Sequence, residues 1–163
     1  MTTTIAFTGH RPKDLEGATY MAFRDALDAL GTTTRTDLRF VVGGALGVDH
    51  WAAVYAQANS IPYTVVLPFP PEVMGKFWSD ADRKHLAADI DGSEELRIVN
   101  HLQYDVRDYQ KRNEWMVDMA DVVFAVWTGK QVGGTANCIR YAKQMRVPVW
   151  NLWPLDGKLH RVK

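Results

Sequence analysis

Gly133, Gly134 and Thr135 form a turn whose residue types could hold a phosphate group. The turn follows an apolar run, Val122–Trp127, and precedes a segment with helical spacing that begins at Cys138. Glycines let the backbone approach an anion closely, and the free N–H groups at a helix start attract it. Thr135 could cap the helix or donate its hydroxyl to a ligand. The same residues would also make an ordinary strand-to-helix turn, so this motif alone is ambiguous.

Two further glycine turns follow apolar runs. Thr8–Arg11 comes after Ile5–Phe7, and Gly43–Gly47 comes after Leu38–Val42. The second turn has neither the spacing of a dinucleotide-binding fingerprint nor the ending of a P-loop. Three such turns on one edge of a sheet would line an anion-accepting crevice with backbone. Asp49, just beyond the second turn, could stabilise a helix start or accept a ribose hydroxyl.

Arg112 and Asn113 are the polar pair with the clearest chemistry. Asn113 shares a helical stripe with Tyr109, Met116 and Ala120, so it should face the sheet. A buried amide without a partner costs about 1–3 kcal/mol, so either backbone at a strand end or a ligand must bond it. Arg112, one position round the helix, could reach a phosphate over the strand ends or remain a solvated surface residue.

Other chemistry finds little support in the sequence. The five histidines show no metal-ligand spacing, and one cysteine cannot build a zinc site. No Gly-x-Ser-x-Gly nucleophile motif is present. Cys138, in the first turn of the last helix, could have a lowered pKa, but we expect it to be a small buried hydrophobic side chain. We therefore expect no metal and no cofactor.

The elements that must position these residues alternate between strand and helix. Strands are expected at Ile5–Phe7, Leu38–Val42, Tyr63–Leu67, Leu96–Val99, Val122–Trp127 and Val147–Leu152. Helices are expected from Thr19 to Gly31, Asp49 to Asn59, Trp78 to Asp89, Tyr104 to Ala120 and Cys138 to Met145, with a loop over Glu72–Asp80 and a loose basic tail from Gly157. This pattern predicts an α/β, Rossmann-like three-layer fold with a mostly parallel sheet of about six strands. The strand ends that bind ligands would then share one edge.

The composition is that of one globular domain, which we place at residues 1–163. Hydrophobic residues make up 47% and charged residues 23% of the chain, which excludes a disordered protein. Lys plus Arg and Asp plus Glu are both 19, and the zero net charge disfavours nucleic acid as a partner. The single cysteine, and the lack of a signal peptide or membrane-spanning run, lead us to expect a cytoplasmic protein with no membrane partner.

Four segments, in this order, resemble the YpsA-like branch of the SLOG superfamily, and the similarity covers essentially the whole chain. They are Thr8–Pro12, Gly43–Asp49, Arg112–Val117 and Gly133–Asn137. The superfamily also includes the LOG phosphoribohydrolases and the Rossmann-like domain of DprA. The resemblance implies a Rossmann-like fold, a nucleotide or nucleotide-derived ligand and a homodimer.

The resemblance leaves open whether the chain is an enzyme. In LOG enzymes an arginine and a glutamate cleave the N-glycosidic bond of a nucleoside monophosphate. Arg112 matches the arginine and Thr135 the loop threonine, but Cys138 stands at the glutamate position. A thiol does not replace a carboxylate well in this chemistry. An enzyme would therefore use Arg112 with Asp49 or Glu114.

We expect first a protein that binds a nucleotide-derived small molecule. An N-glycosidase acting on nucleoside monophosphates is the alternative, and a DprA-like single-stranded DNA binder is the third hypothesis. The residues expected to contact the ligand belong to the three glycine turns and the helix that carries Arg112. They are Thr8, Gly9, His10, Arg11, Gly43, Gly44, Gly47, Asp49, Arg112, Asn113, Gly133, Gly134, Thr135 and Asn137.

Overall fold

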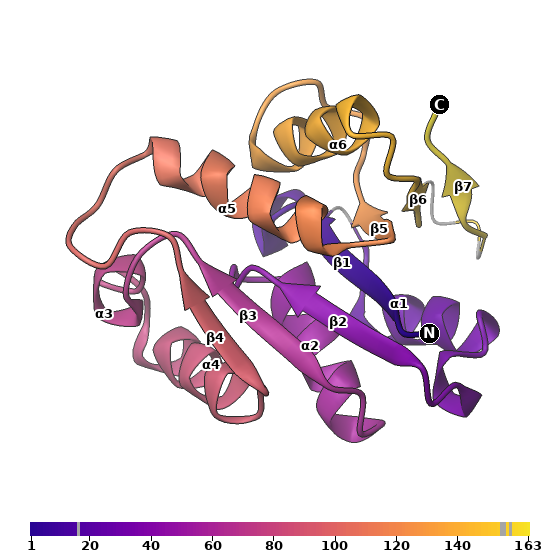
Figure 1. Ribbon diagram of the computed structural model, residues 1–163, viewed down its shortest axis with the longest axis horizontal. Coiled ribbons are helices and arrows are strands. Elements are labelled where there is room, and N and C mark those ends of the chain that lie inside the picture. The colour runs from indigo at the N-terminus through magenta and orange to yellow at the C-terminus, as the bar shows by residue number, and fades with distance from the viewer. Residues whose placement is uncertain (16, 154–155, 157) are drawn as a thin grey trace.

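The computed structural model describes residues 1–15, 17–153, 156 and 158–163 (Figure 1). Within these residues one sheet contains seven strands, in the order β4-β3-β2-β1-β5-β6-β7. Every neighbouring pair is parallel except β6 with β7. The strands are β1 (Thr3–Gly9), β2 (Leu38–Val42), β3 (Tyr63–Leu67), β4 (Glu95–Ile98), β5 (Val122–Val126), β6 (Val149–Asn151) and β7 (His160–Arg161). The α/β, Rossmann-like prediction is confirmed, with one strand more than expected.

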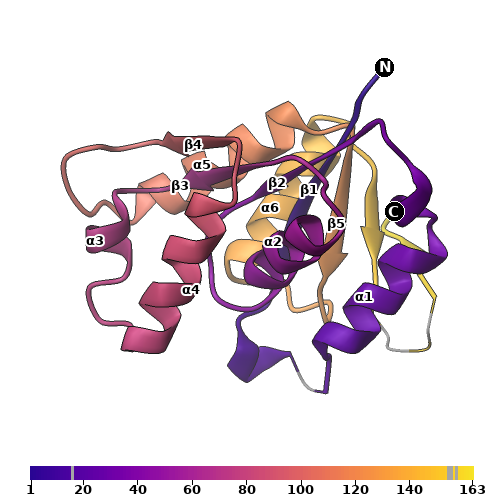
Figure 2. The ribbon, with the colours of Figure 1, turned by 90° about the horizontal axis from the view of Figure 1, so that it is seen from below.

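Helices cover both faces of the sheet (Figures 1 and 2). One face carries α1 (Tyr20–Ala29), α2 (Val48–Ala58) and α4 (Asp80–Asp91), and the other carries α5 (Arg107–Met119) and α6 (Gly134–Gln144). Successive side chains of a strand point to opposite faces. Phe7 of β1 therefore packs in the core beneath α1 and α2, whereas its neighbour Ala6 packs beneath α5 and α6. The shorter elements are η1 (Pro12–Asp14), η2 (Thr32–Thr34) and α3 (Pro71–Met74).

The order of strands reverses at β1, and this reversal positions the site. β2, β3 and β4 follow on one side of β1, while β5, β6 and β7 lie on the other. Crossovers on the two sides leave toward opposite faces, which opens a crevice at the C-terminal ends of the strands where the order reverses. Gly9 of β1 is in register with Val126 of β5. The loop after β1 and the turn into α6 therefore meet at one edge of the sheet.

The segment expected to be a loop over Glu72–Asp80 is partly helical. Pro71 begins the short helix α3, because its missing N–H needs no partner at the first helical position. The next helix begins at Asp80 and not at Trp78. Ser79 sets this start, since its hydroxyl accepts a hydrogen bond from the Asp82 N–H at 3.1 Å.

The basic tail is also more ordered than expected. His160 and Arg161 form β7, which pairs antiparallel with β6, and the Arg161 guanidinium lies 5.7 Å from the Trp150 ring centroid. A contact of this kind favours the strand pairing by placing the cation over the aromatic face. Gly157, where the loose tail was expected to begin, lies outside the described residues. Among the residues described, no helix combines the length and the apolar character that crossing a bilayer requires.

Candidate functional site

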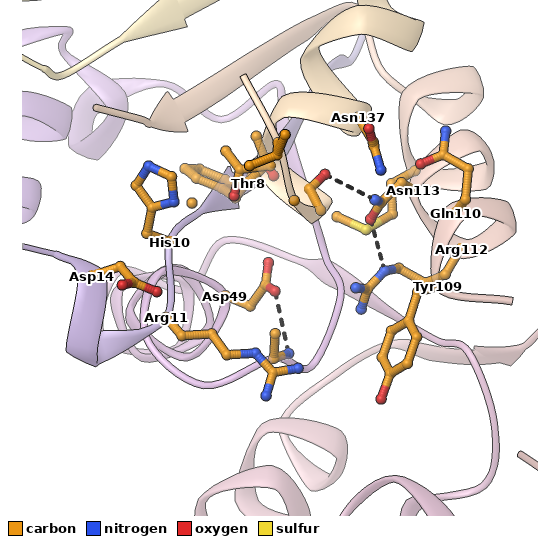
Figure 3. A pocket seen from close by; sticks show the side chains of 18 of the residues that line it. Thr8, His10, Arg11, Asp14, Asp49, Tyr109, Gln110, Arg112, Asn113 and Asn137 are labelled. Carbon is orange, nitrogen blue, oxygen red and sulfur yellow. Dashed lines mark hydrogen bonds between the residues drawn. The ribbon is translucent and has the colours of Figure 1, made fainter. Parts of the chain in front are cut away.

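A cleft of about 640 Å³ opens where the order of strands reverses (Figure 3). Its lining comes from the end of β1 and the loop that follows, the beginning of α2, the α5 helix and the turn into α6. Two of the three glycine turns and the arginine-bearing helix meet here as expected, whereas the turn after β2 contributes only Ala45 to the lining. The cleft is therefore the candidate site, and its polar groups decide what it can bind.

The turn before α6 presents open backbone to the cleft. Gly133 is the residue that precedes the helix, and its φ of 102° is one that side-chain-bearing residues rarely adopt. A Cβ atom built on Gly133 or on Gly134 would meet nothing within 4 Å. The first N–H groups of a helix have no partner within the helix and carry the positive end of its dipole. This turn can therefore receive an anion without steric hindrance.

Arg112 is buried, with 8% of its surface exposed, although it lines the cleft. Its Nη1 donates to the Gly43 carbonyl, and its Nε donates to Asn113 Oδ1 at 3.0 Å. Burial lowers the pKa of this guanidinium, and the negative charge of Asp49 opposes the shift. Within the described chain, no carboxylate lies at ion-pair distance from it. A guanidinium stays charged in proteins. Arg112 is therefore a buried cation, and it has no contacting counterion among the described residues.

Asn113 connects Arg112 to the glycine turn that precedes α6. The prediction that it faces inward is confirmed, since only 7% of its surface is exposed. Its Oδ1 accepts from Arg112, and its Nδ2 donates to the Gly134 carbonyl at 3.3 Å (Figure 3). Backbone at a strand end or a ligand was the expected partner of the Asn113 amide. Its partners are instead the backbone of Gly134, the first residue of α6, and the side chain of Arg112. Asn113 holds the guanidinium and the helix start in fixed relation.

Asp49 supplies a carboxylate in the same cleft. It is 8% exposed, and its Oδ2 accepts a hydrogen bond from the Ala45 N–H at 3.2 Å. Its Oδ1 is buried and makes no hydrogen bond of standard geometry among the residues that the structure describes, although the backbone of Gly43 lies near enough to lower the pKa of the carboxyl. Burial raises the pKa of this carboxyl, and the charge of Arg112 opposes the rise only in part. An unpartnered buried acceptor favours a ligand that brings a hydroxyl or N–H group.

Cys138, which the family resemblance sets against the LOG glutamate, is buried on the α6 side of the core. Burial raises the pKa of its thiol to about 11. The side chain is therefore a neutral thiol at physiological pH, with neither the charge of a carboxylate nor the reactivity of a thiolate.

Ten of the expected ligand-binding residues line the cleft in addition to Arg112: Thr8, Gly9, His10, Arg11, Asp49, Asn113, Gly133, Gly134, Thr135 and Asn137. The structure places the other three glycines elsewhere. The Gly43 carbonyl accepts a hydrogen bond from Arg112. Gly44 and Gly47 line a separate hollow of about 190 Å³ beside α4. Glu114 does not line the cleft either. It lies one helical turn beyond Gln110, and its Oε1 accepts a hydrogen bond from Gln110 Nε2 at 3.3 Å.

Several lining residues escaped the sequence reasoning. Gln110 and Tyr109 of α5 line the cleft, as do the exposed side chains of Tyr104, Lys130 and Val132. Gln110 lies one helical turn before Asn113, so the stripe that predicted Asn113 could also have identified it. Tyr109 lies on that stripe itself, whereas Tyr104, Lys130 and Val132 lie in loops, where no periodic pattern indicates direction.

Comparison with known proteins agrees with this architecture. The family model YpsA, described as the YspA SLOG family, matches residues 5–150. The SPbeta prophage-derived protein YoqJ of Bacillus subtilis is 32% identical over 139 residues, covering 75% of this chain and 80% of that protein.

Two solved structures share the fold at low sequence identity. DNA processing protein A (DprA) from Streptococcus pneumoniae has a TM-score of 0.71 at 19% identity, over 96% of this chain and 53% of that one. DprA from Helicobacter pylori, a protein with a single-stranded DNA binding mode, has a TM-score of 0.63 at 18% identity, over 91% and 64%. The chain thus spans between half and two thirds of these DprA chains.

Proposed function

The chain belongs to the YspA SLOG family, and we propose that it binds a nucleotide or nucleotide-derived ligand in the cleft between β1, α5 and α6. The family and its DprA-like fold support a nucleotide-related role. The proposed contacts follow from the chemistry of the lining residues.

One observation carries this proposal: the buried Arg112 guanidinium, without a contacting carboxylate, faces the same cleft as the first turn of α6. Two separate sources of positive potential thus converge, and Asn113 links them through its two hydrogen bonds. An oxyanion with several acceptor oxygens, such as a phosphate, would satisfy both. Asp49 would then accept a sugar hydroxyl, since a carboxylate next to the phosphate itself would repel it.

The direct test measures binding of nucleoside monophosphates and of ribose 5-phosphate by calorimetry and thermal shift. We expect saturable binding that Arg112→Met weakens by about 10- to 100-fold, the range for a lost charge-assisted hydrogen bond. Arg107→Met is the matched control, because Arg107 lies on the same helix with its side chain 83% exposed and outside the cleft lining. Equal affinities of the two variants, or no binding by the unaltered chain, would overturn the proposal.

An N-glycosidase is the second candidate, and the state of Asp49 is the observation that favours it. A carboxyl whose pKa is raised by burial can hold a proton for the departing base while water adds to the sugar carbon. The position of Glu114 outside the cleft lining favours Asp49 over Glu114 for that role. Release of free base from a nucleoside monophosphate, abolished in Asp49→Asn, would establish the enzyme. Ligand-induced stabilisation without base release would establish a binding protein.

Single-stranded DNA, the ligand of the H. pylori DprA, is the contrasting candidate. The zero net charge of this chain argues against it.

We also propose a homodimer in the cytoplasm, as expected from the family resemblance and the composition. Light scattering would test the homodimer by comparing the mass in solution with the 18.4 kDa of one chain.

A further inference from the structure

Gln110 carries a buried acceptor that the proposed phosphate and sugar contacts do not use. Three buried side-chain polar atoms lack a hydrogen-bond partner in the described residues: Asp49 Oδ1, Thr64 Oγ1 and Gln110 Oε1. Two of the three belong to residues that line the cleft, and both are acceptors. Leaving a buried acceptor without a partner is unfavourable, so its occurrence beside a cleft indicates a ligand that donates a hydrogen bond there.

The orientation of the Gln110 amide follows from its neighbour Glu114. The Gln110 Nε2 donates to Glu114 Oε1 at 3.3 Å, one helical turn along α5. A carboxylate can only accept, so the NH₂ group of the amide must face Glu114. The Oε1 atom is therefore fixed on the opposite side, where only a donor can satisfy it.

Asn137 adds a donor on the same side of the cleft. Its Oδ1 accepts a hydrogen bond from Arg140 Nη1 at 2.7 Å, and arginine can only donate, so the amide nitrogen of Asn137 points away from Arg140. Figure 3 shows Gln110, Asn113 and Asn137 together on the wall formed by α5 and α6, with the Gln110 oxygen on the side of the other two amides. Asn113 is already bonded to Arg112 and Gly134. The wall therefore offers one acceptor and one donor to a ligand.

We propose that Gln110 is a specificity-determining residue that selects a nucleobase with an exocyclic amino group. This inference rests on the proposed nucleotide-binding function. The amino group and adjacent ring nitrogen of adenine or cytosine place a donor beside an acceptor, which matches Gln110 Oε1 and Asn137 Nδ2. A base with a keto oxygen in place of the amino group would set one acceptor against another. Glu114 acts through Gln110 as a positioning residue, because it holds the amide in this orientation.

The test compares matched pairs of nucleotides, AMP with IMP and CMP with UMP, by calorimetry. We expect the amino-bearing member of each pair to bind about tenfold more tightly, and Gln110→Leu to remove the difference. Glu114→Ala should reduce the same ratio, because the amide can then turn its NH₂ group toward the ligand. Gln144→Leu, at an exposed position of α6 outside the cleft lining, should leave the ratio unchanged.

The outcomes separate this inference from the function on which it rests. If no nucleotide binds, the proposed function itself fails. If nucleotides bind but the members of each pair bind equally, the function stands and the role of Gln110 is wrong. A Gln110→Leu variant with a lower melting temperature and an unchanged AMP-to-IMP ratio would likewise show that Gln110 only supports the packing of α5 on α6.

Discussion

At the scale of single residues, the cleft holds two buried charges of opposite sign that do not form an ion pair. Asp49 and Arg112 attract each other, yet burial still raises the pKa of the carboxyl and lowers that of the guanidinium. A fully paired site would satisfy these groups within the protein. Their separation leaves both with capacity for a ligand, and a cost in stability of this kind is common at binding sites.

The Asp49 carboxyl gives a prediction about stability. Its pKa is raised in the folded state, so its stabilising contribution is present below the unfolded pKa and is lost as pH rises through the folded pKa. Asp49→Asn should therefore be the more stable chain at neutral pH, by on the order of 1 kcal/mol or about 2–4 °C in Tm. Urea denaturation across an acid-to-neutral pH series would measure the gain, which should shrink as pH falls through the folded pKa.

Asp25→Asn is the control for this series, because the Asp25 side chain is 63% exposed on α1 and lies outside the cleft lining. It should not reproduce the gain at neutral pH. A less stable Asp49→Asn chain at neutral pH would mean that attraction to Arg112 outweighs burial. The carboxylate would then be a structural group.

Residue-scale prediction from sequence succeeded where a periodic pattern constrained the side chain. The helical stripe predicted the burial of Asn113, which the structure confirms. It placed Arg112 one position round the helix, where a solvated surface residue was one of the two expectations, yet Arg112 is buried. A long side chain can bend beneath its neighbours, so helical position alone does not fix where its charge lies. The unpartnered oxygen of Gln110 depends on three-dimensional neighbours, and no linear pattern indicates it.

At the scale of elements, the start of α6 and the end of β1 use glycine for different reasons. A methyl group on Gly134 would meet nothing within 4 Å and would project from the first turn of α6. A methyl group on Gly9 would overlap the side chain of Val48, the first residue of α2. One glycine keeps the cleft open, and the other permits close packing of a strand on a helix.

These two glycines give a paired prediction. Gly134→Ala should fold with unchanged or slightly higher stability but bind nucleotide about tenfold more weakly, because the methyl group occupies the anion position. Gly9→Ala should lose about 1–3 kcal/mol of unfolding free energy through overpacking. Chemical denaturation and calorimetry on both variants would check this. If Gly134→Ala binds as tightly as the unaltered chain, the anion does not lie on the first turn of α6.

Elements were predictable in proportion to their length and burial. The strands Leu38–Val42 and Tyr63–Leu67 have the bounds expected from their apolar runs. The four-residue helix α3 and the two-residue strand β7 were missed, because neither is long enough to show a period. The position of α3 depends on the proline at its start, and that of β7 depends on its pairing with β6.

At the scale of the whole molecule, the site is a consequence of strand order. The reversal at β1 brings Thr8 and Gly134 together although they lie far apart in the sequence. Apolar spacing could predict the strands and their parallel direction, but it could not predict the order in which they pair. The expectation that the glycine turns share one edge followed from the handedness of crossovers, a property of the whole sheet.

The whole-molecule charge supports the last prediction, which separates a small ligand from nucleic acid. Binding to a polynucleotide gains from the release of condensed counterions, and proteins that use many phosphate contacts lose about 10³–10⁵ in affinity between about 50 and 200 mM salt. A chain with 19 basic and 19 acidic residues has no net charge with which to attract such a polymer. We expect an oligodeoxynucleotide of about 20 residues to bind no more tightly than a mononucleotide in fluorescence anisotropy and competition experiments, with less than about a tenfold change over that salt range. Saturable oligonucleotide binding with a steep salt dependence, retained in Arg112→Met, would place nucleic acid on another surface and make the cleft secondary.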